Sequence, residues 1–200
     1  MGRPAKNSNE KPAELRMQEA FWKVLAEKPY TQMTVADIAR ASEVNKNTLY
    51  YHYECLDDLA KQCVNQELPI DIINKIASGK LPCELLTELD ELNRAETLAR
   101  LNLAIGPHGC GILAEFARNA ALSLWFERFN LTESDLLAEE VIACRFVTSG
   151  MLSVFGVAEG LSPKEFISFV SSPLASSVIS KTLEVLKTAQ QRTENTESAR

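Results

Sequence analysis

The stretch 34–53 constrains the fold more than any other part of this sequence. It reads TVADIARASEVNKNTLYYHY, in which two short segments with helical spacing are separated by about three residues. Thr34 and Asn45 each precede such a segment, and their side chains are suited to accept backbone N–H groups at a helix start. The stretch therefore predicts helices over 35–41 and 46–52, joined as a helix-turn-helix.

The apolar residues of this stretch predict how the two helices pack. Ile38 and Ala39 on the first helix and Leu49 and Tyr53 on the second should face one core, with Val44 filling the turn. The opposite face of the second helix offers donors, acceptors and an aromatic ring but no acid, from Lys46, Asn47, Thr48, Tyr51 and His52. Such a face suits the major groove of double-stranded DNA.

The rest of the chain also shows helical spacing, with proline and glycine at the breaks and no alternating strand pattern. We expect an all-α fold of about nine or ten helices. The first should begin near Pro12 and end at Pro29, and a fourth should begin near Leu56. The last two long ones should cover 133–158 and 163–189, the second interrupted at Pro173. Residues 1–11 are expected to form a flexible arm, and 190–200 a disordered tail.

The helix-turn-helix residues also resemble a known family. Ile38-Ala39, Val44 and the run Thr48-Leu49-Tyr50-Tyr51-His52-Tyr53 are similar to the signature of TetR-type transcription regulators, in which Thr-Leu-Tyr-x-His-Phe closes the recognition helix. Asp57-Asp58-Leu59 is similar to the start of the family's fourth helix, so the resemblance covers about residues 13–65. It implies a DNA-binding domain over 12–55 and a helical dimerisation and effector-binding domain over 56–189.

The resemblance also implies which residues contact a DNA operator. Base edges or the groove would be contacted by Lys46, Asn47, Thr48 and Tyr51. Phosphates would be contacted by Thr34, Tyr50 and His52. The sequence departs from the family pattern where glycine is usual, at Glu43 in the turn and at Asn47. It departs again at Leu56, where the family often has a phosphate-binding lysine. If Glu43 is left-handed, it costs about 1 kcal/mol relative to glycine.

For the second domain, the resemblance implies a homodimer that binds a palindromic operator and represses transcription until a small hydrophobic or aromatic effector releases it. The last two long helices are the expected interface, because together with their mates they would form a four-helix bundle. Small residues that allow close approach there are Ser149, Gly150, Ser153 and Gly156. The candidate effector-pocket residues are Phe116, Trp125, Phe126, Phe129, Phe146, Met151 and Phe155.

Two other functions remain open. The chain could bind DNA under the control of a protein partner or of cysteine oxidation, without a small effector. It could also be an interaction adaptor that has kept the fold and lost operator binding, as Glu43 and Leu56 would allow. We expect neither an enzyme nor a cofactor or metal, because no Ser/His/Asp set or HExxH motif occurs. The segment 106–111, GPHGCG, lacks the residues of a phosphate loop and is expected to be an inter-helix loop.

Charge and cysteine usage agree with this interpretation. Residues 1–52 carry eight Lys/Arg and six Asp/Glu, whereas the other 148 carry 13 and 21, so a mildly basic head precedes an acidic body. Five cysteines without CxxC spacing suggest reduced thiols in a cytoplasmic protein. No apolar segment follows Met1 as in a secretory signal, and the apolar stretch 141–158 contains Arg145, so we expect neither export nor a membrane span.

Overall fold

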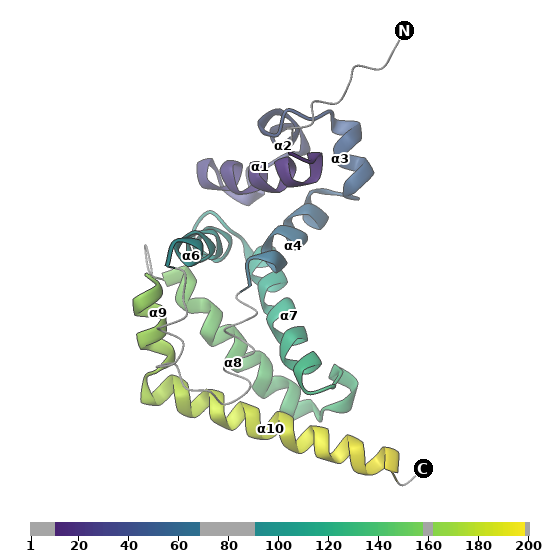
Figure 1. Ribbon diagram of the computed structural model, residues 1–200, viewed down its shortest axis with the longest axis vertical. Helices are drawn as coiled ribbons and strands as arrows, with labels where there is room; N and C mark the ends of the chain where they lie inside the picture. Colours follow the sequence, from purple (N-terminus) through teal and green to yellow (C-terminus); the bar gives the residue numbers. More distant parts are fainter. Residues whose placement is uncertain (1–10, 69–90, 158–161, 199–200) are drawn as a thin grey trace.

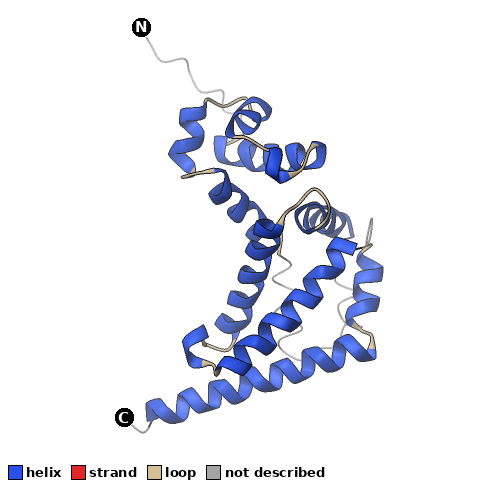
Figure 2. Ribbon diagram, turned by 180° about the vertical axis from the view of Figure 1, so that it is seen from behind, coloured by secondary structure: helices blue, strands red, loops and turns tan. Residues whose placement is uncertain are grey.

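The computed structural model describes residues 11–68, 91–157 and 162–198. Within these ranges all regular structure is helical, with nine α-helices and two short 3-10 turns (Figures 1 and 2). The prediction of an all-α chain that begins with a helix-turn-helix is confirmed. No helix in the described ranges is both long and apolar enough to cross a membrane.

The N-terminal head, residues 11–66, lies at one end of the molecule (Figure 1). Its elements are α1 Ala13–Glu27, the 3-10 turn η1 Tyr30–Gln32, α2 Val35–Ala41, α3 Lys46–His52 and α4 Leu56–Gln66. Pro12 caps α1, as proline suits a helix start, and Pro29 follows its end. The predicted bounds of α2 and α3 and the predicted starts of α1 and α4 are confirmed to within one residue.

A single buried cluster holds the head together. Phe21 of α1, Ile38 of α2 and Leu49 of α3 are each fully buried, as the spacing predicts. Phe21 meets the rings of Trp22 and Tyr30 edge to face, with centroids 5.0 and 6.3 Å away. The short helices α2 and α3 are therefore fixed relative to α1, and α3 is left with one face outward.

The body follows the head. Its elements are α6 Glu91–Ile105, α7 Gly111–Arg128, the 3-10 turn η3 Glu133–Asp135, α8 Ala138–Val157, α9 Pro163–Val170 and α10 Pro173–Ser198. α7 and α8 form an antiparallel pair, and α10 crosses the end of the body that is far from the head (Figure 1). Leu101 and Leu186 are buried in the core cluster that these helices share. The predicted break at Pro173 is confirmed, since α9 ends at Val170.

Two expected boundaries are wrong. The helix expected from residue 133 begins at Ala138, because Thr132 and Asp135 close a 3-10 turn with a capping box before it. The disordered tail expected over 190–200 is helical as far as Ser198. Arg192 stabilises this last part of α10, because its guanidinium donates to both carboxylate oxygens of Glu140, at 3.0 and 2.7 Å.

The loop between α6 and α7 fastens the body to the head. His108 Nδ1 lies 2.7 Å from the backbone oxygen of Leu25 in α1, and the Tyr30 N–H donates to the His108 oxygen at 2.8 Å. Gly109 is needed for this tight path, because a Cβ there would lie 1.8 Å from the Ala104 oxygen. The segment expected to be only an inter-helix loop is therefore also a contact with α1.

A second attachment lies on α6 itself. The guanidinium of Arg100 donates to Glu67, directly after α4, and to Glu96 one turn earlier on α6. It also lies over the ring of Trp22 in α1, 5.7 Å from the ring centroid. Arg100 thus contacts α1 directly and the C-terminal end of α4 through Glu67.

Candidate nucleic-acid interface

Side-chain caps fix the starts of the two helix-turn-helix helices. The Thr34 hydroxyl accepts from the Asp37 N–H, and Asp37 accepts in turn from the Thr34 N–H at 2.9 Å. Hydrogen bonds from the Lys28 ammonium, at 2.5 Å, and then from the Thr34 hydroxyl lower the pKa of Asp37 to about 2. At the start of α3, Asn45 Oδ1 accepts from the Asn47 N–H at 2.9 Å. Both predicted N-caps are confirmed.

The outer face of α3 carries most of the predicted DNA-contacting residues. Tyr51 is 85% exposed and Tyr50 56% exposed, although large aromatic side chains are usually at least partly buried. Lys46, Asn47 and His52 are also exposed, and Thr48 is half-buried. The Tyr51 and His52 rings meet edge to face. Thr34 is exposed at the start of α2 rather than on α3.

The opposite face of α3 explains why these side chains point outward. Leu49 is fully buried and Tyr53 is 2% exposed, so the helix can turn neither side chain into solvent without opening the core. Burial raises the pKa of the Tyr53 hydroxyl to about 12. The arrangement leaves a rigid, polar and aromatic ridge without a carboxylate, which can donate to phosphates and to base edges.

Glu43 has the left-handed backbone that the missing glycine would favour. Its φ is 55°, in the turn between α2 and α3. Glu43 is therefore in the strained conformation whose cost relative to glycine is about 1 kcal/mol.

Replacing Glu43 by glycine should raise the free energy of unfolding by about 1 kcal/mol, because glycine adopts this conformation without a Cβ clash. Urea denaturation of the full chain measures the change. Asn130 is the matched control, because it has a similar φ of 51° and asparagine tolerates this region. A Glu43→Gly gain no larger than that of Asn130→Gly would contradict the assignment of strain to Glu43.

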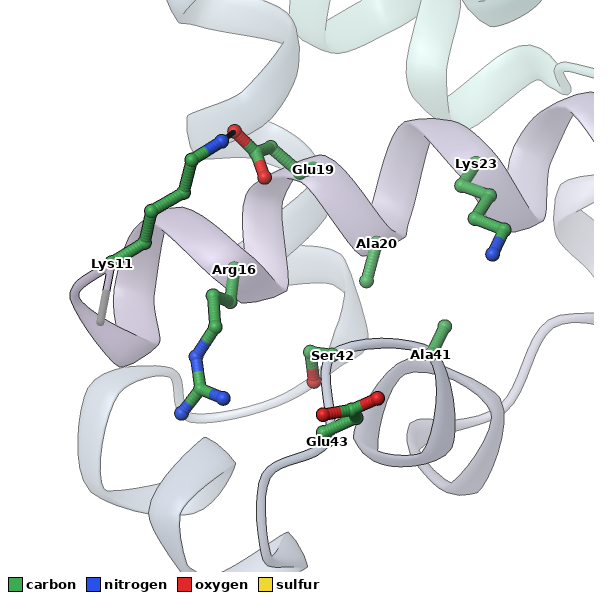
Figure 3. A pocket seen from close by; sticks show the side chains of 8 residues that line it. All are labelled: Lys11, Arg16, Glu19, Ala20, Lys23, Ala41, Ser42 and Glu43. Carbon is green, nitrogen blue, oxygen red and sulfur yellow. Dashed lines mark hydrogen bonds and ion pairs between the residues drawn. The ribbon is translucent and has the colours of Figure 1, made fainter. Parts of the chain in front are cut away.

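A solvent-open groove of about 440 Å³ lies between α1 and the turn that precedes α3. Figure 3 shows Lys11, Arg16 and Lys23 on the α1 side and Glu43 on the turn side. Lys11 is paired with Glu19 at 2.6 Å. Two carboxylates, Glu19 and Glu43, also line the groove, so the three cations leave only a small excess of positive charge beside the end of α2. The pattern of α3 alone did not indicate this charge.

The start of α4 is anchored without the family's usual lysine. Leu56 is half-buried against the core of the head. The hydroxyl of buried Tyr30 donates to Asp57, and burial, followed by this carboxylate, raises the pKa of Tyr30. Position 56 therefore serves packing, and the family's phosphate contact from this position has no counterpart here.

The predicted effector residues do not form one group. Trp125, Phe126, Phe129 and Phe155 are buried in the core of the body, and Met151 packs against them. Phe116 packs instead against the cluster of the head. Phe146 is 75% exposed on α8. The prediction that it lines an interior pocket is therefore wrong for a single protomer.

An open groove of about 500 Å³ passes one of these residues. Phe126 lines it together with Leu122 of α7, Leu131 and Thr132 after α7, and Arg145 of α8. Arg145 is paired with Glu133 at 2.9 Å across this region. Most of its other lining residues are polar, and Trp125 and Phe155 are not among them.

Comparison with known proteins supports the identification of the head. Residues 19–63 match the family described as bacterial regulatory proteins, tetR family. No curated protein matches the sequence. Among solved structures, the TetR family repressor AlkX from Dietzia sp. strain DQ12-45-1b, described as implicated in biodegradation of n-alkanes, is similar at 18% identity. That match covers 92% of this chain and all of the other, with a TM-score of 0.33, and it is too distant to bear on function. Through residues 19–63, which include its helix-turn-helix, the chain is therefore similar to the tetR family of bacterial regulatory proteins.

Proposed function

We propose that the chain is a repressor that binds a palindromic operator as a homodimer and leaves it when a small hydrophobic or aromatic effector binds the body. The observation that carries the proposal is the outward face of α3, which is exposed, free of acids and held rigid by Leu49. One such helix makes too few contacts for tight specific binding. A two-fold dimer that places two α3 helices in successive major grooves meets this need.

An apolar stripe on α8 supports dimerisation. Ile142 is 66% exposed and Phe146 75% exposed, one helical turn apart. Gly150 continues the stripe, and a Cβ added there would meet no atom within 4 Å. Ser153 is exposed one turn further along. Such a stripe, ending in small residues, allows a second α8 to pack closely against the first.

Two details limit this interface. Gly156, expected to serve it, packs inside the chain, where an added Cβ would lie 3.1 Å from the Ile105 oxygen. On α10, Leu174 is the exposed large apolar side chain, and Lys181 and Glu184 are exposed on the same side. We therefore assign the centre of the interface to α8 and its edge to α10.

Phe146→Glu should convert the dimer to a monomer, because two carboxylates would meet in an apolar contact. Light scattering after size-exclusion chromatography measures the mass, and operator affinity should fall by at least about tenfold. Leu174→Glu is the matched control at the edge and should leave the dimer assembled. A Phe146→Glu chain that stays dimeric would contradict an interface centred on α8.

The attachments of α6 support release by an effector. Arg100 contacts Trp22 and Glu67, and His108 contacts Leu25, so movement of α6 would turn the head. Two heads turned in opposite senses would no longer match half-sites about one DNA turn apart.

Fluorescence anisotropy tests the proposal. DNA from the region flanking the protein's own gene is compared with shuffled DNA of equal length, at low and at moderate salt. Preferential binding that weakens with salt supports the regulator. Equal and negligible binding to both DNAs, repeated with a random-sequence DNA selection, would favour the adaptor instead, and a protein partner would then be sought on the α8 stripe.

A further inference from the structure

The α7–α8 pair brings two polar side chains to one level of the core. Leu122 of α7 and Cys144 of α8 belong to the same buried cluster. Arg118 lies one turn before Leu122, and Thr148 lies one turn after Cys144. Because the helices are antiparallel, going from Leu122 back to Arg118 on α7 and going from Cys144 forward to Thr148 on α8 lead in the same direction. Arg118 and Thr148 therefore lie at the same level of the pair. Helical spacing also keeps each residue on the inward stripe of its helix.

Both side chains have a buried polar atom without a partner. Thr148 is 4% exposed, and its Oγ1 has no hydrogen bond. The Nε of Arg118 is buried and has none either. Buried polar groups in native proteins nearly always have partners, so two such atoms at one level need an explanation.

Other polar side chains of the body do have hydrogen-bond or ion-pair partners. Thr182 in α10 is as buried as Thr148, and its hydroxyl donates to the Val178 oxygen at 2.9 Å. Arg145 and Arg192 are each paired with a glutamate. Within the described part of the body, the buried polar side-chain atoms without a hydrogen bond are therefore those of Arg118 and Thr148.

The chemistry of the two atoms defines which group could bind them. The guanidinium Nε–H donates only, and the hydroxyl can donate, so the missing group is an acceptor, best a negatively charged one with two oxygens. Trp125 lies two turns further along α7 and Phe155 two turns further along α8, so in this antiparallel pair the two rings flank the Arg118–Thr148 level from opposite sides. The side chains of Trp125 and Phe155 are largely apolar. A group that meets both conditions is a carboxylate on an apolar body.

We propose that the effector of this regulator is an amphipathic carboxylic acid whose carboxylate is bound by Arg118 and Thr148 and whose apolar part packs among the core side chains of α7 and α8. This inference rests on the proposed effector-released function and names the chemical class of the effector. The other occupant of such a site is a buried water, which would bridge the same two atoms without selecting a carboxylate.

Calorimetric titration of the full chain tests the assignment. The probes are two matched pairs, 4-phenylbutyrate with 4-phenylbutan-1-ol and octanoate with octan-1-ol. At least one carboxylate should bind about tenfold or more tightly than its alcohol, because charge-assisted hydrogen bonds distinguish the two head groups. Arg118→Met should remove this preference, and Arg118→Lys should keep part of it.

Two further variants guard against a folding defect. Thr148→Val keeps the shape of the side chain and should weaken carboxylate binding alone. Arg128→Met removes the same charge from the exposed end of α7 and should bind the carboxylates like the parent chain. Thermal melting and DNA titration of the same samples report whether each variant is folded and whether the DNA-binding function stands.

Three results would overturn the inference. The alcohols could bind as tightly as the carboxylates, the carboxylates could bind Arg118→Met as tightly as the parent chain, or no probe could bind at all, as expected for a buried water only. Any of these with intact DNA binding would refute the carboxylate site and leave the regulator standing. Loss of DNA binding by the parent chain would instead refute the proposed function.

Discussion

Replacing Lys46 and Tyr51 together by alanine should raise the dissociation constant for operator DNA by at least about 30-fold. Each side chain stands on the outer face of α3, and a good contact to a base edge contributes about 1–3 kcal/mol. Tyr51 is 85% exposed, so its removal deletes contact to DNA and little packing. Fluorescence anisotropy at constant salt measures the change, and the salt slope should fall with the loss of the lysine.

The control for this experiment is Lys187→Ala. Lys187 is exposed on α10, at the opposite end of the molecule from α3 (Figure 1), and the substitution removes the same charge. It should leave the affinity within about twofold, because at moderate salt a charge that far away is screened. The melting temperatures of both variants should match the parent chain. A double variant that binds the operator as tightly as the control would mean that α3 does not read DNA.

Phe21→Ala should lower the free energy of unfolding by about 3–5 kcal/mol, because a fully buried ring would leave a cavity. The ring also loses its edge-to-face contacts with Trp22 and Tyr30. Domains of this size are commonly stable by only 5–15 kcal/mol, so a large part of the stability would be lost. Chemical denaturation measures the change, and operator binding should fall with it because α1 supports α2 and α3.

Leu15→Ala on the same helix is the matched comparison. Leu15 is 42% exposed, and its truncation should change the free energy of unfolding by no more than about 0.5 kcal/mol. Equal losses for Phe21→Ala and Leu15→Ala would show that the buried cluster does not hold the head together.

The head could be predicted closely from sequence because its signals are local. Thr34 and Asn45 act on N–H groups two or three residues away, and Pro29 acts on the helix directly before it. Neither effect depends on distant parts of the chain. The direction in which α3 faces also follows from spacing, since Leu49 and Tyr53 lie one turn apart on the buried side.

The body was harder to predict because its helices are apolar on more than one side. The spacing of apolar residues in α8 predicts the same buried environment for Phe146 and Phe155, yet Phe146 is 75% exposed and Phe155 only 3%. Which side of such a helix is covered depends on its neighbours, and these are brought together only by the tertiary fold. The same limit applies to His108, whose partner Leu25 lies 83 residues earlier, and to Arg192, whose partner Glu140 lies 52 residues earlier.

The central claim is that two α3 helices read one DNA site together, and a selection from random-sequence double-stranded DNA tests it most directly. The full chain is the bait, and Lys46→Ala/Tyr51→Ala is the parallel control. We predict enrichment of palindromic sequences whose half-site centres lie about 10 base pairs apart, with no enrichment by the control. A folded parent chain that enriches no sequence, or the same sequences as the control, would contradict the account.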